Sequence, residues 1–337
     1  MAGQPDASDP LTLTRWWRAA PDAAEQVRAD VDAWAQRVTD SGLLEAFGGT
    51  VAAGEPLLDF LERFAAAHWD FRAGRERNLA TVPDLTPAQL EAIADAVGPL
   101  GLDGTPPPSL DNYDTVIMTG GMVRAGIVKP RHVRELVDAG VSFDEVTFLG
   151  AFRPFAGDEV DLASELGVEG DDEFDAMVAG LEKSFGPFPH GEVSEYSDDS
   201  PFASWRDVRW KLDGMDVRAV AAPSSEPERR RAHTGDTFRF WAERIPSSIR
   251  NVLVVTTPVY VPYQAAVAVE VLGLEYGITV ETVAVSDSAN DLGPLTQRFL
   301  PHHQLQELRS AIRGMRSLAS ALDDCNIPTI TRVVRYE

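Results

Sequence analysis

Cysteine is nearly absent from this chain of 337 residues. The single Cys325 excludes an intramolecular disulfide and a cysteine-based zinc cluster. Its neighbours Asp323 and Asp324 disfavour a thiolate, so we expect no cysteine nucleophile. Long apolar runs are also missing, because none reaches the ~18–20 residues of a membrane span. The first residues lack the basic and apolar regions of a signal peptide, and we therefore expect a cytoplasmic protein.

Basic residues are scarce relative to acidic ones. The chain has 30 Lys and Arg against 53 Asp and Glu, which gives a formal net charge of −23. Nucleic acids and anionic membrane surfaces attract basic proteins, so we expect neither as a partner. Established catalytic motifs are missing as well: there is no Gly-x-Ser-x-Gly, Walker loop or His-Glu-x-x-His. The six histidines show no paired spacing with one another or with cysteine, and we expect no metal site.

The chain is long enough for a full core and two structural units. Apolar residues in the first 105 positions recur at helical spacing, most clearly over residues 21–38 and 57–65. Thr86 followed by proline is a typical helix start. Residues 101–108 contain three consecutive prolines and suggest a boundary. We expect a helical N-terminal region over residues 1–105.

From residue 113 onward, short apolar runs alternate with helical patterns. The runs cover residues 115–118, 145–149, 217–221, 251–255 and 280–285, and the helical patterns 131–139, 171–185, 234–243 and 261–272, with a last helix at 305–322. This alternation predicts an α/β domain over residues 106–337, with a Rossmann-like, mostly parallel, five-stranded sheet and helices on both faces. Residues 187–204 are rich in Ser, Asp, Gly and Pro and are expected to form a long loop, typical of a lid or binding loop.

The expected strands end in residues suited to binding a ligand. Thr119 is followed by Gly120 and Gly121, whose backbone can approach an anion closely, although a simple tight turn is the alternative. The dinucleotide fingerprint Gly-x-Gly-x-x-Gly is absent. Arg124 and Arg153 are candidate anion contacts, since arginine binds phosphate or carboxylate through two parallel hydrogen bonds.

The remaining strand ends supply further candidates. Further ligand contacts are expected at Arg229, Arg230, Arg231, Thr234, Thr237, Thr256, Thr257, Ser286 and Asp287, and catalytic roles at His233, Asp236 and Tyr260. The alternatives are a surface charge run for the arginines and helix capping for Thr234 and Asp236. We expect Thr234 and Asp236 to line the same crevice as Thr256, Thr257 and Tyr260, since parallel strand ends meet at one edge of a sheet.

Three of these motifs, taken in order, resemble the bacterial YdcF/SanA-like family, a Rossmann-like group. The matching positions are Gly120–Gly121, Thr234-Gly-Asp236-Thr237, and Thr256-Thr257 with Tyr260 and Gln264. Asp and Thr replace a Glu and an Asn of the family pattern, and its later His and Arg are missing. The resemblance covers about residues 113–290. It implies a nucleotide-like or S-adenosylmethionine-like ligand over the strand ends.

Two functional hypotheses follow. The first is an enzyme of small-molecule metabolism, a transferase, that binds a nucleotide-like or phosphorylated small molecule. The second is a non-catalytic ligand-binding or scaffold protein with the N-terminal helices as its interface, where the adjacent Trp16 and Trp17 mark a partner surface or the core. A homodimer is compatible with either hypothesis.

Overall fold

The computed structural model describes residues 16, 20–71 and 82–325. Its N-terminal part consists of helices α1 (Ala23–Asp40), α2 (Leu43–Ala46), α3 (Leu57–His68) and α4 (Pro87–Val97). Helix α4 begins with a capping box, in which the Thr86 hydroxyl accepts from the Gln89 N–H and the Gln89 side chain accepts from the Thr86 N–H. The helical N-terminal region is therefore confirmed for the described residues.

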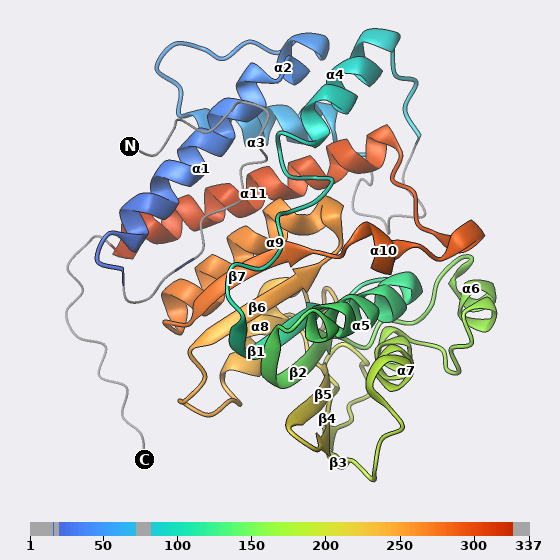
Figure 1. Cartoon of the computed structure of the whole chain (residues 1–337). Helices are drawn as coiled ribbons and strands as arrows, with labels where there is room; N and C mark the ends of the chain where they lie inside the picture. The colour runs from blue at the N-terminus through green and yellow to red at the C-terminus, as the bar shows by residue number, and fades with distance from the viewer. Residues whose placement is uncertain (1–15, 17–19, 72–81, 326–337) are drawn as a thin grey trace.

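A seven-stranded, mostly parallel sheet forms the centre of the rest of the chain (Figure 1). Its strands are β1 (Asn112–Thr119), β2 (Ser142–Gly150), β3 (Glu192–Tyr196), β4 (Trp205–Leu212), β5 (Met215–Ala221), β6 (Asn251–Thr256) and β7 (Thr279–Ala284). The order across the sheet is β3-β4-β5-β2-β1-β6-β7. The α/β class is confirmed. The expected number of five strands is wrong, although the five apolar runs correspond to the parallel strands β1, β2, β5, β6 and β7.

The two additional strands form an antiparallel extension at one edge of the sheet. Strand β4 pairs antiparallel with both β3 and β5. Strand β3 lies inside the expected loop at 187–204, so that expectation is wrong for these five residues. All residues of β3 are exposed, and the strand therefore lacks the apolar pattern that would have revealed it.

Helices cover both faces of the sheet. On one face lie α5 (Val123–Asp138) and α7 (Glu173–Phe185), with the short α6 (Glu159–Glu165) and α10 (Asp287–Asn290) near the strand ends (Figure 1). On the other face lie α8 (Thr234–Ala242) and α9 (Val261–Ala268), which the π-helix η3 (Val269–Glu275) continues. Neighbouring residues of β1 alternate between the two cores: Val116 and Met118 pack with α5 and α7, and Ile117 packs with α8 and α9.

Helix α5 begins eight residues before the expected start at residue 131 and runs through Pro130. A proline inside a helix removes the N–H that would bond to the carbonyl four residues earlier, here that of Gly126. Helix α7 crosses at this point. A Cβ at Gly180 would lie 1.8 Å from the Gly126 carbonyl oxygen, so the two helices approach this closely only because Gly180 has no side chain.

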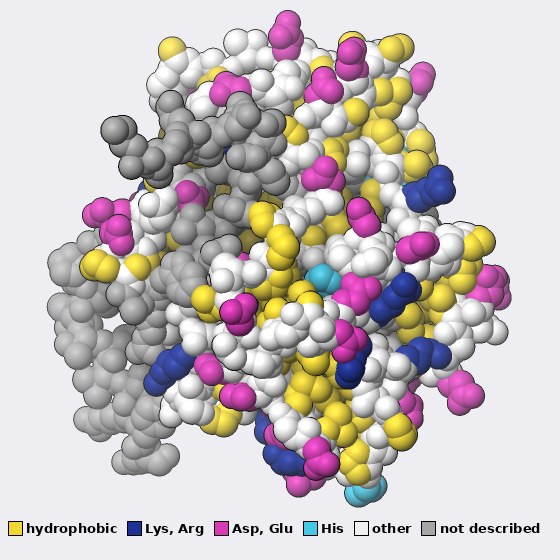
Figure 2. All heavy atoms as spheres, in the orientation of Figure 1, with side chains coloured by type: hydrophobic (Ala, Val, Ile, Leu, Met, Phe, Trp, Pro, Cys, Tyr) yellow, Lys and Arg dark blue, Asp and Glu magenta, His cyan; other side chains and the backbone are white. Residues whose placement is uncertain are grey.

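The long helix α11 (Pro301–Cys325) joins the N-terminal helices to the sheet layers, because it packs against α9 on one side and against α1, α3 and α4 on the other (Figure 1). One continuous hydrophobic core therefore contains residues of α1 and α3 together with Ile117 and Val252 of the sheet. Trp16 packs against this core, and Trp17 lies outside the described residues. Acidic side chains are scattered over the face in Figure 2.

Candidate functional site

The five parallel strands lie in the order β5-β2-β1-β6-β7, which is the chain order 3-2-1-4-5 of doubly wound sheets. From β1 the chain adds β2 and β5 on one side of the sheet and then β6 and β7 on the other, so the direction in which strands are added reverses between β1 and β6. Ligands of such sheets bind outside the carboxyl ends of the strands at this reversal. The last residues of the two strands are joined there, because the buried Thr119 hydroxyl donates to the Thr256 hydroxyl over 3.2 Å.

A cleft with a volume of about 1550 Å³ opens at this edge and continues along α11 toward α1 and α3. We call it the strand-end cleft. Its inner part is lined by the end of β1, the end of β2, the segment before α8 and the start of α9. The lining residues used below are Thr119, Gly120, Gly121, Arg153, Glu159, Glu173, Arg230, Arg231, His233, Thr234, Gly235, Thr237, Thr257, Tyr260 and Gln264.

Three helical segments begin at this cleft. Helix α5 follows β1, and α8 follows the three arginines at residues 229–231. The 3₁₀ helix η2 (Pro258–Tyr260) follows β6 and leads into α9. In the described part of the chain, the main-chain N–H groups of Gly121, Thr234 and Gly235 make no hydrogen bond. Free N–H groups and the helix dipole give a helix N-terminus a partial positive charge. This edge of the sheet is therefore suited to an anion.

The three adjacent arginines have different positions. Arg230 and Arg231 line the strand-end cleft, and Arg230 also binds Asp236 and Glu226. Arg229 does not line it. Its side chain is 78% exposed and pairs with Glu226 over 2.9 Å, so the expectation of an anion contact is corrected for this residue.

Arg153 lines the cleft but is buried among acidic groups. It donates two hydrogen bonds to Glu159, at 2.7 and 2.8 Å, and one to Glu173 at 3.1 Å. Burial lowers the pKa of Arg153, but the hydrogen bonds and charges of the two glutamates raise it by more, so the net shift is upward. A fourth hydrogen bond goes to the Gly121 carbonyl oxygen. Arg153 thus holds the turn formed by Gly120 and Gly121, called the glycine turn below, and its expected contact with an anion stays a prediction.

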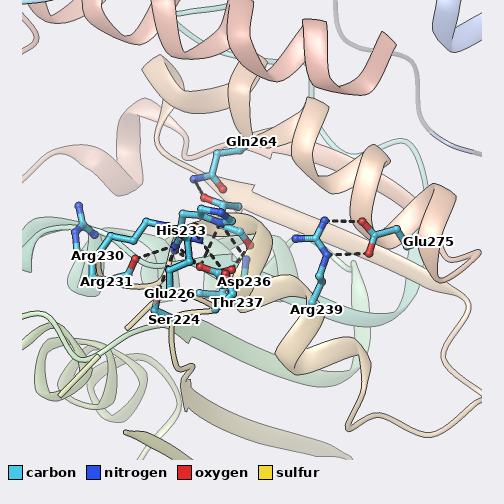
Figure 3. Close-up of polar contacts among 12 residues, drawn as sticks. Ser224, Glu226, Arg230, Arg231, His233, Asp236, Thr237, Arg239, Gln264 and Glu275 are labelled. Atoms are coloured by element: carbon cyan, nitrogen blue, oxygen red, sulfur yellow. Dashed lines mark hydrogen bonds and ion pairs between the residues drawn. The ribbon is translucent and has the colours of Figure 1, made fainter. Parts of the chain in front are cut away.

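His233 and Asp236 form a capping box at the start of α8 (Figure 3). The His233 Nδ1 accepts from the Asp236 N–H over 3.1 Å, and the Asp236 carboxylate accepts from the His233 N–H over 3.1 Å and from Arg230. Burial raises the pKa of Asp236, but the Arg230 hydrogen bond leads the opposing effects, which lower it overall. Asp236 does not line the cleft, unlike Thr234 and Tyr260, and its expected catalytic role stays a prediction.

Most of the other expected contacts do line the cleft. The Thr234 hydroxyl accepts from Gln264 Nε2 over 3.2 Å, and the Thr237 hydroxyl donates to the Thr234 carbonyl over 2.9 Å. Thr257 and Tyr260 follow β6. Thr256 is fully buried behind them and does not reach the cleft, which corrects its expected role.

Three expected contacts lie elsewhere. The Arg124 Nε donates to the Leu295 carbonyl over 2.6 Å, outside the cleft. Ser286 caps α10 through the Ala289 N–H, and its hydroxyl donates to Glu135 over 2.8 Å. Asp287 lies in the first turn of α10. These residues contribute to the packing of α5, α10 and the following loop outside the cleft, and their expected role in ligand binding stays a prediction.

Three buried charged residues near the glycine turn were missed from the sequence: Lys129, Glu159 and Glu173. Lys129 is 1% exposed and donates to the carbonyls of Thr119 and Gly120 and, over 3.0 Å, to the Thr119 hydroxyl. Burial lowers the pKa of Lys129 to about 7, although Glu173 opposes the shift. Charged residues on helices usually face water, so the sequence gives little sign of burial beyond small residues such as Gly120 and Gly150, which pack against Glu173.

One acidic cluster could hold a cation. The carboxylates of Asp171, Asp172 and Asp175 lie within 4.8 Å of one another at the start of α7. Asp172 caps this helix, and Asp175 accepts from the Asp171 N–H over 3.0 Å. Helix capping explains these positions, and none of the three residues lines the strand-end cleft.

Comparisons with known proteins identify relatives. Residues 18–101 match the family model described as the Rv3785 N-terminal domain. Uncharacterized protein Rv3785 of Mycobacterium tuberculosis and uncharacterized protein Mb3814 of Mycobacterium bovis are each 30% identical to this chain over 343 residues, covering 93% of this chain and 94% of the relative. No solved structure matches. Within the described residues, no helix is both long and apolar enough to cross a membrane. The chain belongs to the Rv3785 family.

Proposed function

We propose that this protein is an enzyme of small-molecule metabolism that binds a nucleotide-like or phosphorylated ligand in the strand-end cleft and transfers a group to or from it. The observation that carries the proposal is the meeting of three helix starts and two arginines at the point where the sheet connections reverse. This arrangement is Rossmann-like. It supports the ligand class that the resemblance to the YdcF/SanA-like family implies.

The anionic group of the ligand belongs between the glycine turn and the start of α8. The N–H groups of Gly121 and Gly235 are available there, and Arg231 lines the same cleft. A phosphate or a carboxylate suits free N–H groups at helix starts beside an arginine, and each helix start stabilises an anion by about 0.3–1 kcal/mol. A cationic or purely apolar ligand would leave the Gly121 and Gly235 N–H groups without acceptors.

The rest of the cleft supports a group transfer. Its volume of about 1550 Å³ exceeds the roughly 300–1000 Å³ of most small-molecule pockets, so it has room for a donor and an acceptor together. Thr257, Tyr260 and Gln264 add hydroxyl and amide groups to the lining of the same cleft. Such groups suit the hydroxyls of a ribose or another sugar.

Of the three catalytic candidates, His233 and Tyr260 line the cleft, and we take His233 as the principal one. Burial lowers the pKa of His233 and so favours the neutral ring. Its Nδ1 accepts a hydrogen bond from the Asp236 N–H, which leaves the proton on Nε2. We assign His233 the role of a donor through Nε2 to a developing negative charge. Asp236 acts on the ligand only by fixing this ring and Arg230.

Two adjacent arginines provide a matched test. We expect purified protein to bind at least one of ATP, S-adenosylmethionine, glucose 6-phosphate and sulfate in a thermal-shift screen followed by calorimetry. Arg231→Gln should weaken binding at least about tenfold, roughly 1.4 kcal/mol. Arg229→Gln removes the same charge outside the cleft and should change the affinity less than about twofold. Equal effects of the two substitutions, or no binding of any probe, would refute the proposed site.

Turnover separates the enzyme from the scaffold alternative. Mass spectrometry of a bound nucleotide incubated with candidate acceptors should reveal a transferred group, and His233→Ala should slow the transfer about 10²-fold or more while preserving the fold. Saturable binding without any product would favour the non-catalytic ligand-binding protein. A homodimer is compatible with either function, and light scattering tests for it.

A further inference from the structure

Lys129 is a lysine whose side chain is almost completely buried. It is one of only three lysines in the chain and is 1% exposed, whereas Lys183 and Lys211 lie at the surface. Its position on α5 places the ammonium directly behind the turn that connects β1 to this helix. All three ammonium N–H groups have an acceptor: the Thr119 carbonyl, the Thr119 hydroxyl and the Gly120 carbonyl.

These contacts fix the glycine turn from behind, while its other side faces the cleft. A Cβ at Gly121 would lie 3.9 Å from the Lys129 Nζ. A second anchor comes from Arg153, which donates to the Gly121 carbonyl. Both carbonyls of the turn are thus held by cations inside the protein, so the Gly121 N–H stays available on the cleft side.

The charged groups around Lys129 come from α7, α6 and the segment after β2. The Glu173 carboxylate packs against Gly120, where a Cβ would lie 2.2 Å from its Oε1. Glu173 is bound by Arg153, and Arg153 is bound by Glu159. The two glutamates and Arg153 already balance much of their own charge. The Lys129 ammonium instead donates to neutral oxygens of Thr119 and Gly120, so burial disfavours its charged form.

We propose that Lys129 is a positioning residue of the strand-end cleft, whose protonated form holds the glycine turn for an anion, so that anion binding is coupled to proton uptake at Lys129. This inference rests on the proposed function. The bound anion stabilises the ammonium through the turn, and by reciprocity the ammonium stabilises the anion. Since burial lowers the pKa of Lys129 to about 7, affinity should fall as the pH rises above that value.

Three lysines allow a direct measurement. Protein labelled with ¹³C at the lysine ε carbons should give one signal per lysine, and Lys183→Arg and Lys211→Arg identify the signal of Lys129 by elimination. Sulfate is the probe, because it keeps both charges between pH 6 and 9. Saturating sulfate should raise the titration midpoint of Lys129 by about one unit or more, a tenfold coupling. The signals of Lys183 and Lys211, which lie outside the cleft, should not respond to sulfate. Sodium chloride at the same ionic strength should not shift the Lys129 midpoint.

Calorimetry supplies the second readout. The dissociation constant for sulfate should rise about tenfold between pH 6 and pH 8.5 in the wild type and should lose this dependence in Lys129→Met and Lys129→Gln. A purely structural lysine would not move this pH profile. Two outcomes would overturn this inference while leaving the anion site intact. One is sulfate binding that does not move the titration midpoint of Lys129. The other is a folded Lys129 variant whose sulfate affinity keeps the wild-type pH dependence. No saturable sulfate binding at pH 6 would overturn the inference together with the anion site itself.

Discussion

At Gly120, the absence of one carbon atom determines how closely β1 approaches α7. A Cβ there would lie 2.2 Å from Glu173 Oε1 and 3.0 Å from the Gly150 Cα. We therefore expect Gly120→Ala to lower the free energy of unfolding by about 1–3 kcal/mol, because Glu173 and its bond to Arg153 must shift. At Gly104 a Cβ would meet no atom within 4 Å, so Gly104→Ala serves as the control. Urea denaturation that gives equal stabilities for the two alanine variants would contradict this account.

Asp236 shows how a capping residue resembles a catalytic one in sequence. Its carboxylate is 4% exposed and binds Arg230 and the His233 N–H. Asn caps a helix about as well as Asp but cannot pair with Arg230. We expect Asp236→Asn to lower stability by about 1–3 kcal/mol and to leave the affinity for the bound anion within about twofold. A tenfold loss of affinity at unchanged stability would instead place the carboxylate at the ligand.

Lys129 also makes stability depend on pH. Its pKa falls from an ordinary value of 10.5 to about 7 on folding, so between these values the unfolded chain binds a proton that the folded protein does not. Because the unfolded state binds more protons in this range, lowering the pH favours unfolding. The contribution of Lys129 to stability therefore rises with pH from about 7 upward. Below pH 7 the full cost of the buried charge is present.

Comparison of the wild type with Lys129→Met isolates this contribution. The difference in the free energy of unfolding, wild type minus variant, should increase from pH 7 to pH 9.5, as measured by urea denaturation in steps of half a pH unit. Lys211→Met, at an exposed position, is the control and should give a difference with much less pH dependence. A flat difference for Lys129→Met would show that the buried amine does not titrate in this range.

At the scale of elements, the crossing of α5 and α7 depends on Gly180. A Cβ at this position would lie 1.8 Å from the Gly126 carbonyl oxygen and 2.8 Å from its carbonyl carbon. Since these are backbone atoms, only separation of the helices relieves the overlap. We expect Gly180→Ala to destabilise the protein by about 3 kcal/mol or more, which thermal and urea unfolding would detect. A variant with wild-type stability would show that the helices can separate at little cost.

The elements that the sequence predicted well are those whose residues are buried on both sides. Apolar runs such as 251–255 are unambiguous, and all five lie in parallel strands. Strand β4 alternates, with Val208 and Trp210 buried between charged residues, so its pattern was available, whereas the exposed β3 had none. Site roles were harder to predict. Arg153 pairs with Glu159, six residues further on, and with Glu173, and only the folded chain shows that both carboxylates turn toward the arginine.

At the scale of the whole molecule, one core joins the N-terminal helices, α11 and the sheet. Trp34 of α1 and Trp241 of α8 are fully buried in the same hydrophobic cluster. We therefore expect a single cooperative unfolding transition, with tryptophan fluorescence and far-ultraviolet circular dichroism giving coincident curves. Two separated transitions would instead support independent units at residues 1–105 and 106–337.

The contact between Trp16 and β7 has a consequence for colloidal behaviour. Trp16 and Val280 exchange two main-chain hydrogen bonds, each of 3.1 Å, on the side of β7 that faces away from β6. An open edge strand is a template on which further chains add and grow into fibrils. Trp16 occupies part of this template, and its indole packs on Gly273, where any side chain would collide with the ring. The backbone of Trp16 thereby covers part of an edge on which another chain could otherwise add.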